Sequence, residues 1–161
     1  MESLLLALNG WLDGIGLVDW ARGSAVVYPI ANVLHILGLV MLVGAIAVVD
    51  LRIAGLWRRL PLEPLSHALT PIAIAGLLVQ GASGLVLFAA DGEALATSTT
   101  FQLKLILLAL AVLNALSFRF RWRRKRPGAL AQPSPIERAS ALFSLFVWVC
   151  IAILGRLIAY Y

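Results

Sequence analysis

Four residues of kinds that can bind a ligand fall in four different apolar runs of this chain. They are His35, Gln80, Lys104 and Arg156. Counted at 1.5 Å per residue from the ends of the predicted helices, His35 and Gln80 lie roughly 14 Å deep, and Lys104 and Arg156 roughly 7 Å deep. Ionisable groups at membrane depth are costly, so each is a candidate functional residue.

The surroundings of His35 indicate a flat ligand. One stripe of a predicted helix holds Tyr28, Asn32, His35, Gly38 and Leu42. Gly38 stands one turn below the imidazole and removes side-chain bulk beside it. Such an arrangement is typical of haem b in a helical bundle, where histidine is the axial ligand.

The haem b hypothesis gives each polar residue a role. His35 is the metal ligand, Lys104 and Arg156 face the propionates, and Gln80 is a supporting hydrogen-bond partner. A second axial ligand is harder to assign. His67, the other histidine, lies roughly 20 Å away in depth, and neither Met41 nor Cys150 is an obvious partner.

Two other interpretations stay open for these residues. His35 can be an interhelical hydrogen-bonding residue, with Lys104 and Arg156 extending to the membrane surface. A copper path is a second metal hypothesis, but copper(I) prefers sulfur ligands. Only Cys150, Met1 and Met41 supply sulfur.

Composition places these residues in a membrane protein. The chain has 161 residues, 61% of them hydrophobic and only 13% charged, whereas soluble domains carry about 25% charged residues. With so little polar surface, the bilayer is the expected solvent and partner. The length predicts a single domain.

Hydropathy predicts an all-α fold, a four-helix transmembrane bundle of up-down topology. A short amphipathic helix at residues 3–15 precedes it and is expected to lie on the membrane surface. Its apolar face holds Leu4, Leu5, Leu8, Trp11, Leu12 and Ile15. The expected spans are residues 26–49, 68–90, 99–118 and 139–161, with an acidic, Ser/Thr-rich loop after residue 90.

Basic residues predict the orientation. Ten of the thirteen fall in the loops after the first and third spans, including a run at residues 119–126. The positive-inside rule puts these loops in the cytoplasm and both termini in the periplasm of a bacterial inner membrane. The basic run is interpreted as a lipid-headgroup patch rather than a nucleic-acid site.

The remaining polar residues are interpreted as structural. Asp50 and Arg52 close the first span and are expected to pair with each other or with loop residues. Asn114 is expected to form an interhelical hydrogen bond. The cytoplasmic half of the bundle is otherwise expected to be almost wholly apolar. No catalytic set of residues stands out, so an enzyme is not indicated.

The stretch YPIANVLHILGLVMLVGAIAVVDLRIAGL carries a family resemblance. Tyr-Pro, His-x-x-Gly, Leu-Val-Gly and Asp-Leu-Arg recur in an uncharacterised family of small four-span bacterial membrane proteins. The resemblance continues through SGLVLFAAD, FQLKLILLALAVLNALSF and GRLIAYY. That family distantly resembles the copper-resistance D proteins and b-type cytochrome bundles. It often has an acidic residue and a further histidine where this chain has Asn32 and, approximately, Phe118.

The leading prediction is therefore a periplasm-facing polar pocket that binds haem b for electron transfer. Two alternatives stay open. One is transport of copper or another small solute. The other is a non-catalytic subunit of a larger membrane complex or homo-oligomer.

Overall fold

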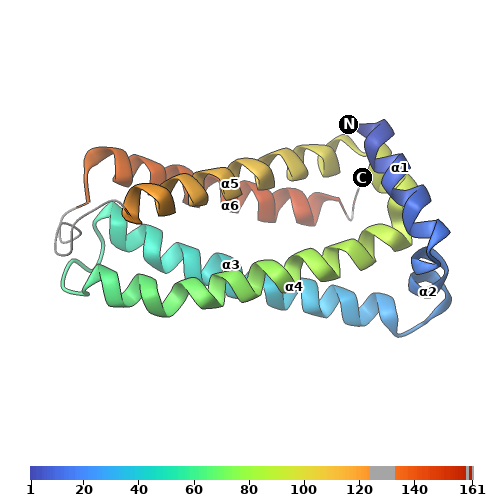
Figure 1. The fold of residues 1–161 in the computed structure, drawn as a ribbon, viewed down its shortest axis with the longest axis horizontal. Helices are drawn as coiled ribbons and strands as arrows, with labels where there is room; N and C mark the ends of the chain where they lie inside the picture. The colour runs from blue at the N-terminus through green and yellow to red at the C-terminus, as the bar shows by residue number, and fades with distance from the viewer. Residues whose placement is uncertain (124–132, 159, 161) are drawn as a thin grey trace.

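Every regular element in the described part of the computed structural model is an α-helix (Figure 1). The structure describes residues 1–123, 133–158 and 160. The elements are α1 (Glu2–Gly14), α2 (Leu17–Gly23), α3 (Val27–Ala54), α4 (Leu62–Thr97), α5 (Thr99–Arg123) and α6 (Pro135–Leu157). The predicted all-α bundle is confirmed.

Four of these helices, α3 to α6, are long and apolar enough to cross a membrane. They run alternately up and down (Figure 1), as expected for a multi-pass membrane protein. The observed helices begin or end several residues away from the predicted spans. The predicted spans cover the apolar part of each helix that matches the thickness of the hydrocarbon layer, and helical turns with polar residues lie beyond it. The part of the prediction at residues 124–132, 159 and 161 lies outside the described residues.

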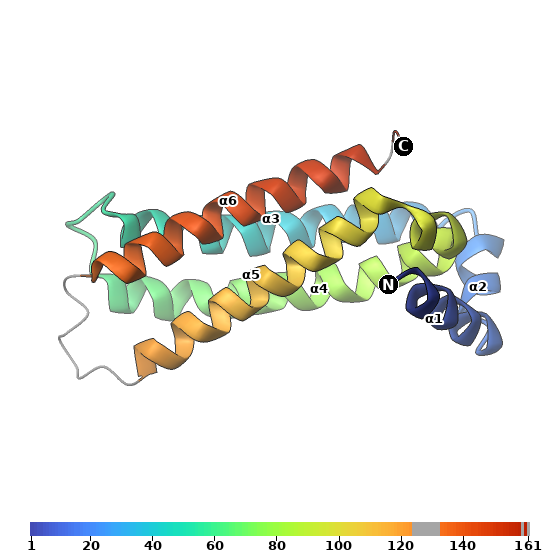
Figure 2. The ribbon, with the colours of Figure 1, turned by 90° about the horizontal axis from the view of Figure 1, so that it is seen from above.

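The four long helices pack as two pairs. Helix α3 packs most extensively on α4, and α5 packs on α6; α3 also contacts α6, whereas α4 and α5 touch little. The two pairs lie one above the other in Figure 1, and α5 crosses obliquely in Figure 2. Apolar side chains join the pairs near mid-length, among them Leu42 of α3, Ala111 of α5 and Trp148 of α6.

Helices α1 and α2 lie across one end of the bundle, called here the capped end (Figure 1). They form a pair bent by 80°. Leu12 is fully buried and Leu5 nearly so, in a cluster with Phe88 and Ala89 of α4. The apolar face that was predicted for residues 3–15 is therefore only partly covered by the bundle. The bundle covers these two leucines, and a stripe of four side chains stays exposed, namely Leu4, Leu8, Trp11 and Ile15.

Two features of the capped end differ from the sequence expectation. Helix α2 falls where no element was predicted. The expected loop after residue 90 is instead a continuation of α4, with non-helical backbone angles at Asp91. Arg22 of α2 donates to the carbonyl of Ala90 at 2.7 Å, and so supplies a partner for a carbonyl at the break. The side chain of Asn9 packs against Gly92, where any Cβ would overlap it.

The opposite end, called the turn end, holds the α3–α4 connection. Gly55 ends α3 with φ of 123°, a conformation that favours glycine. Arg52 donates to the carbonyls of Leu60 at 2.7 Å and Arg58 at 3.1 Å. Of the two expectations for Arg52, pairing with loop residues is the one that the structure bears out.

Helix α6 begins at a capping box. The Ser134 amide donates to the Glu137 carboxylate at 2.7 Å, and the Glu137 amide donates to the Ser134 hydroxyl at 3.4 Å. The predicted start at residue 139 was therefore late. The sequence Ser-Pro-Ile-Glu at residues 134–137 is typical of a helix start and indicates where α6 begins.

Candidate functional site

His35 is held by two side chains of α4. Its Nδ1 lies 3.1 Å from the Ser83 hydroxyl, and its Nε2 lies 3.2 Å from the Gln80 amide nitrogen. Gln80 and Ser83 are three residues apart, so they share one face of α4. The structure therefore brings the predicted residues His35 and Gln80 together, and adds Ser83, which was not among the predicted site residues.

The hydrogen bonds assign the tautomer of His35. The Ser83 hydroxyl donates its single hydrogen to the Val79 carbonyl at 2.6 Å, so it accepts from His35 and Nδ1 carries the ring hydrogen. The Nε2 atom is then the acceptor of the Gln80 amide N–H. Both nitrogens of the neutral imidazole are thus engaged, whereas the Gln80 Oε1 atom is buried without a hydrogen-bond partner.

Gly38 has a different role from the one predicted. A Cβ at Gly38 would lie 2.8 Å from the backbone nitrogen of Gln80 and 3.0 Å from the carbonyl oxygen of Gly76. A Cβ at Gly76 would lie 2.6 Å from the backbone nitrogen of Leu42. The backbone of α4 thus occupies the space expected for a flat ligand. The two glycines let α3 and α4 approach closely, and this approach positions His35.

Lys104 of α5 is a charged residue near this network. Its side chain is half-buried, and its ammonium acts electrostatically on His35. A Cβ at Gly155 of α6 would lie 3.5 Å from its Nζ, so the lysine side chain lies over a glycine. His35, Gln80, Lys104 and Gly155 therefore bring all four long helices to one level of the bundle.

Three other predicted site residues lie in other surroundings and are not hydrogen-bonded to His35, Gln80 or Ser83. Arg156 donates to the Tyr160 hydroxyl at 2.5 Å, and its guanidinium carbon is 4.8 Å from the centre of that ring. The Tyr28 hydroxyl interacts with the Asp91 carboxylate at the capped end. The Asn32 side chain is exposed. Arg156 thus has a local partner just beyond the end of its own helix, and Lys104 is the predicted cation whose charge acts on His35.

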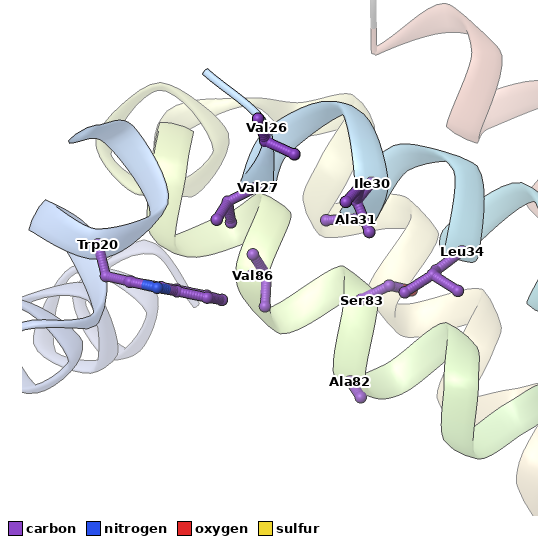
Figure 3. A pocket seen from close by; sticks show the side chains of 9 residues that line it. All are labelled: Trp20, Val26, Val27, Ile30, Ala31, Leu34, Ala82, Ser83 and Val86. Atoms are coloured by element: carbon purple, nitrogen blue, oxygen red, sulfur yellow. The ribbon is translucent and has the colours of Figure 1, made fainter. Parts of the chain in front are cut away.

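A lateral groove of about 310 Å³ is lined by residues of α2, α3 and α4 (Figure 3). Trp20 of α2 lies at one end of it, Val27 of α3 lies near Val86 of α4, and Leu34 of α3 lies near Ser83 of α4. Its lining is almost wholly apolar. Ser83, whose hydroxyl is already bonded to His35 and Val79, is the polar exception. The groove therefore offers little for the recognition of a polar solute.

The residues around His35 do not fit an axial haem ligand in this arrangement. An iron ligand needs a ring nitrogen with a free lone pair, but Nδ1 donates to Ser83 and Nε2 accepts from Gln80. Gly38, which was expected to make room for the ring, is covered by α4. Among the described residues, no group of three or more His, Cys, Asp or Glu side chains could hold a metal ion.

Polar residues at the turn end were underestimated by the sequence. Asn114 of α5 and Ser140 of α6 form a reciprocal pair, with Ser140 Oγ donating to Asn114 Oδ1 at 2.7 Å and Asn114 Nδ2 donating to the Ser140 carbonyl at 3.2 Å. This pair confirms the expectation for Asn114. Asp50, Ser144 and Glu137 are also buried. The expectation that this half is almost wholly apolar is therefore wrong, because small hydroxyl residues on α6 provide polar partners that hydropathy averages hide.

Comparison of the chain with protein-family models, with curated proteins and with solved structures finds no match. The family resemblance stays a prediction from the sequence.

Proposed function

We propose that this multi-pass membrane protein binds a small anionic solute inside its bundle, at Lys104 and Gln80 beside His35. The observation that carries the proposal is the position of Lys104. Its ammonium lies near enough to His35 to act on it electrostatically, and it has no acidic partner among the residues that the structure describes. A membrane-embedded cation without a protein counter-charge costs several kcal/mol, and a bound anion would offset that cost.

The chemistry of the surrounding groups supports an anion over a metal. Lysine offers three N–H donors and no acceptor, and the Gln80 amide has a second N–H beyond the one given to His35. These groups complement carboxylate or other oxyanion oxygens. With one cation in the site, a singly charged solute is the best match. Transport of a small solute, rather than electron transfer, is the activity that such a site would serve.

The charge distribution supports an orientation for the proposed site. The basic residues near the turn end include Arg52, Arg58 and Arg59, and α5 carries Arg119 and Arg121 to the same end. By the positive-inside rule, the turn end faces the cytoplasm of an inner membrane and the capped end faces the periplasm. The solute would then bind in the half nearer the periplasm.

Thermal unfolding of the purified protein in detergent tests the proposal. Sodium salts of chloride, nitrate, formate, acetate and phosphate are compared at constant ionic strength. A ligand at 100 times its dissociation constant stabilises by about 2.7 kcal/mol, which raises the midpoint by roughly 5–10 °C in a domain of this size. Lys104→Met should abolish the shift, and Lys104→Arg should keep part of it.

Arg156→Gln is the matched control, because it removes a cation near the same end of the bundle that is bonded to Tyr160 instead. It should leave the anion effect unchanged. The proposal fails if no anion raises the midpoint or if Lys104→Met responds as the unmodified protein does. A Soret band in protein from a haem-competent host that is lost in His35→Ala would restore the cytochrome hypothesis instead.

Labelling of single cysteines tests the orientation. In a Cys150→Ser background, cysteines replace Gly10 on α1 and Glu63 near the turn end, both exposed positions. A membrane-impermeant maleimide applied to spheroplasts should label the residue-10 cysteine and spare the residue-63 cysteine. The opposite pattern would refute the proposed orientation.

A further inference from the structure

The contact between α3 and α6 near the turn end buries a carboxyl group. Asp50 is 9% exposed, and its side chain is hydrogen-bonded to Ser144, itself 6% exposed. The Asp50 Oδ2 atom is buried without any hydrogen-bond partner. A buried carboxylate oxygen in this condition is costly unless it gains a proton or a donor.

A buried donor without an acceptor lies on α6, the helix that packs against α3 here. Trp148 is one helical turn beyond Ser144 on α6, is 4% exposed, and its Nε1 has no hydrogen-bond partner. The indole nitrogen can only donate. Helical side chains lean toward the N-terminus of their own helix. Helices α3 and α6 are antiparallel (Figure 1). The Asp50 side chain is therefore expected to extend toward the capped end and that of Trp148 toward the turn end, so that the two extend toward each other along the bundle axis.

The charged groups near Asp50 are engaged elsewhere. On α3, Arg52 donates to the carbonyls of the 55–60 turn. On α6, Glu137 forms the capping box, and on α5, Arg121 donates to the Ser140 hydroxyl at 3.4 Å. On α4, His67 is exposed. The described residues thus provide hydroxyl and indole groups for Asp50 and no salt bridge.

We propose that Asp50, Ser144 and Trp148 form a proton-binding site within the bundle. In the structure, neither Oδ2 nor the Trp148 N–H has a partner. In the proposed ionised form, one carboxylate oxygen accepts from Ser144 and the Trp148 N–H turns to donate to Oδ2. Proton uptake forms an O–H bond at Oδ2, with the proton supplied by water at the turn end and no other bond broken. Oδ2 then becomes a donor, and the indole hydrogen bond weakens.

The ligand is a proton rather than a metal cation. The indole N–H presents the positive end of its dipole to Oδ2, which disfavours a cation at that place. A metal would also need more oxygen ligands than Asp50 and Ser144 supply. The site lies toward the turn end, whereas Lys104 and His35 lie toward the capped end, so this inference does not depend on the proposed anion site.

The test follows the indole N–H signals of ¹⁵N-tryptophan-labelled, full-length protein in detergent micelles by NMR as the pH changes. The Trp148 signal is assigned by its loss in Trp148→Phe. We expect it to move along a one-proton titration curve, and Asp50→Asn to abolish the movement. Asp13→Asn is the matched control, because Asp13 is an exposed acid on α1, and it should leave the curve unchanged.

A Trp148 signal that does not move with pH would overturn the inference. So would a curve that is the same in Asp50→Asn as in the unmodified protein. Asp50→Glu guards against a variant that fails to fold, since it keeps a carboxyl group. It should retain a titration with a displaced midpoint, and a folded Asp50→Glu protein without any titration would also contradict the proposal.

Discussion

One methyl group added at Gly76 tests whether the close contact of α3 and α4 positions His35. The Cβ of Gly76→Ala would lie 2.6 Å from the backbone nitrogen of Leu42 and 2.9 Å from the carbonyl oxygen of Gly38. Ordinary van der Waals contact begins at 3.4 Å, so α3 must retreat by about 0.8 Å. Backbone atoms of a long helix cannot turn aside as a flexible side chain can.

The expected cost has two parts. Overpacking of a tight contact destabilises by typically 1–3 kcal/mol. The bonds from His35 to Ser83 and Gln80 start at 3.1 and 3.2 Å, and a retreat of this size takes them beyond hydrogen-bonding range. Each interhelical hydrogen bond in a membrane contributes about 0.6 kcal/mol. The variant should therefore lose about 2–4 kcal/mol of unfolding free energy.

Reversible unfolding in mixed micelles, driven by a rising mole fraction of SDS and followed by circular dichroism, measures this loss. Gly81→Ala is the control, because it adds the same methyl group to α4 where no atom lies within 4 Å. It should be neutral or slightly stabilising, since alanine favours helix by up to about 1 kcal/mol. Equal stabilities for the two variants would refute the close-contact argument.

Three further substitutions test other parts of the bundle. Arg22→Gln removes the donor to the Ala90 carbonyl. Amide hydrogen exchange in the segment after the α4 break should become about tenfold faster, as expected for the loss of a charged hydrogen bond of about 1.5 kcal/mol. Unchanged exchange would show that the bond is dispensable. A double-mutant cycle with Asn114→Ala and Ser140→Ala should give a coupling energy of about 0.6 to 1.7 kcal/mol in SDS unfolding, whereas additive losses would argue against the pair. Arg52→Met should make the α3–α4 turn markedly more sensitive to limited proteolysis, with cleavage elsewhere as the internal reference.

Much of the fold was predictable because it depends on local composition. Runs of apolar residues longer than a bilayer core specify spanning helices wherever they occur. The presence of His35, Gln80, Lys104 and Arg156 within four different runs could also be read directly. Helix periodicity placed Gln80 and Ser83 on one face of α4. It did not indicate which side chain of another helix would meet that face.

The tertiary structure decided what the site residues do. Gly38 looked like space for a ligand, but the packing of α4 fills that space and engages both nitrogens of His35. Lys104 and Arg156 looked equivalent in depth, yet Lys104 acts electrostatically on His35, whereas Arg156 is bonded to Tyr160 just beyond the end of α6. Asp50 looked like a helix-end residue, but it is buried beside Ser144 of α6.

The physical reason lies in the range of the forces involved. Transfer of a helix into lipid depends on the residues of that helix, so the sequence by itself determined that the chain has four spanning helices and which polar groups they carry. The contacts between helices depend on surfaces that no single segment contains. Only the tertiary structure decided that the small surfaces at Gly38 and Gly76 bring α3 and α4 into close contact. It also decided that Lys104, left without an acidic partner in the described bundle, acts electrostatically on His35.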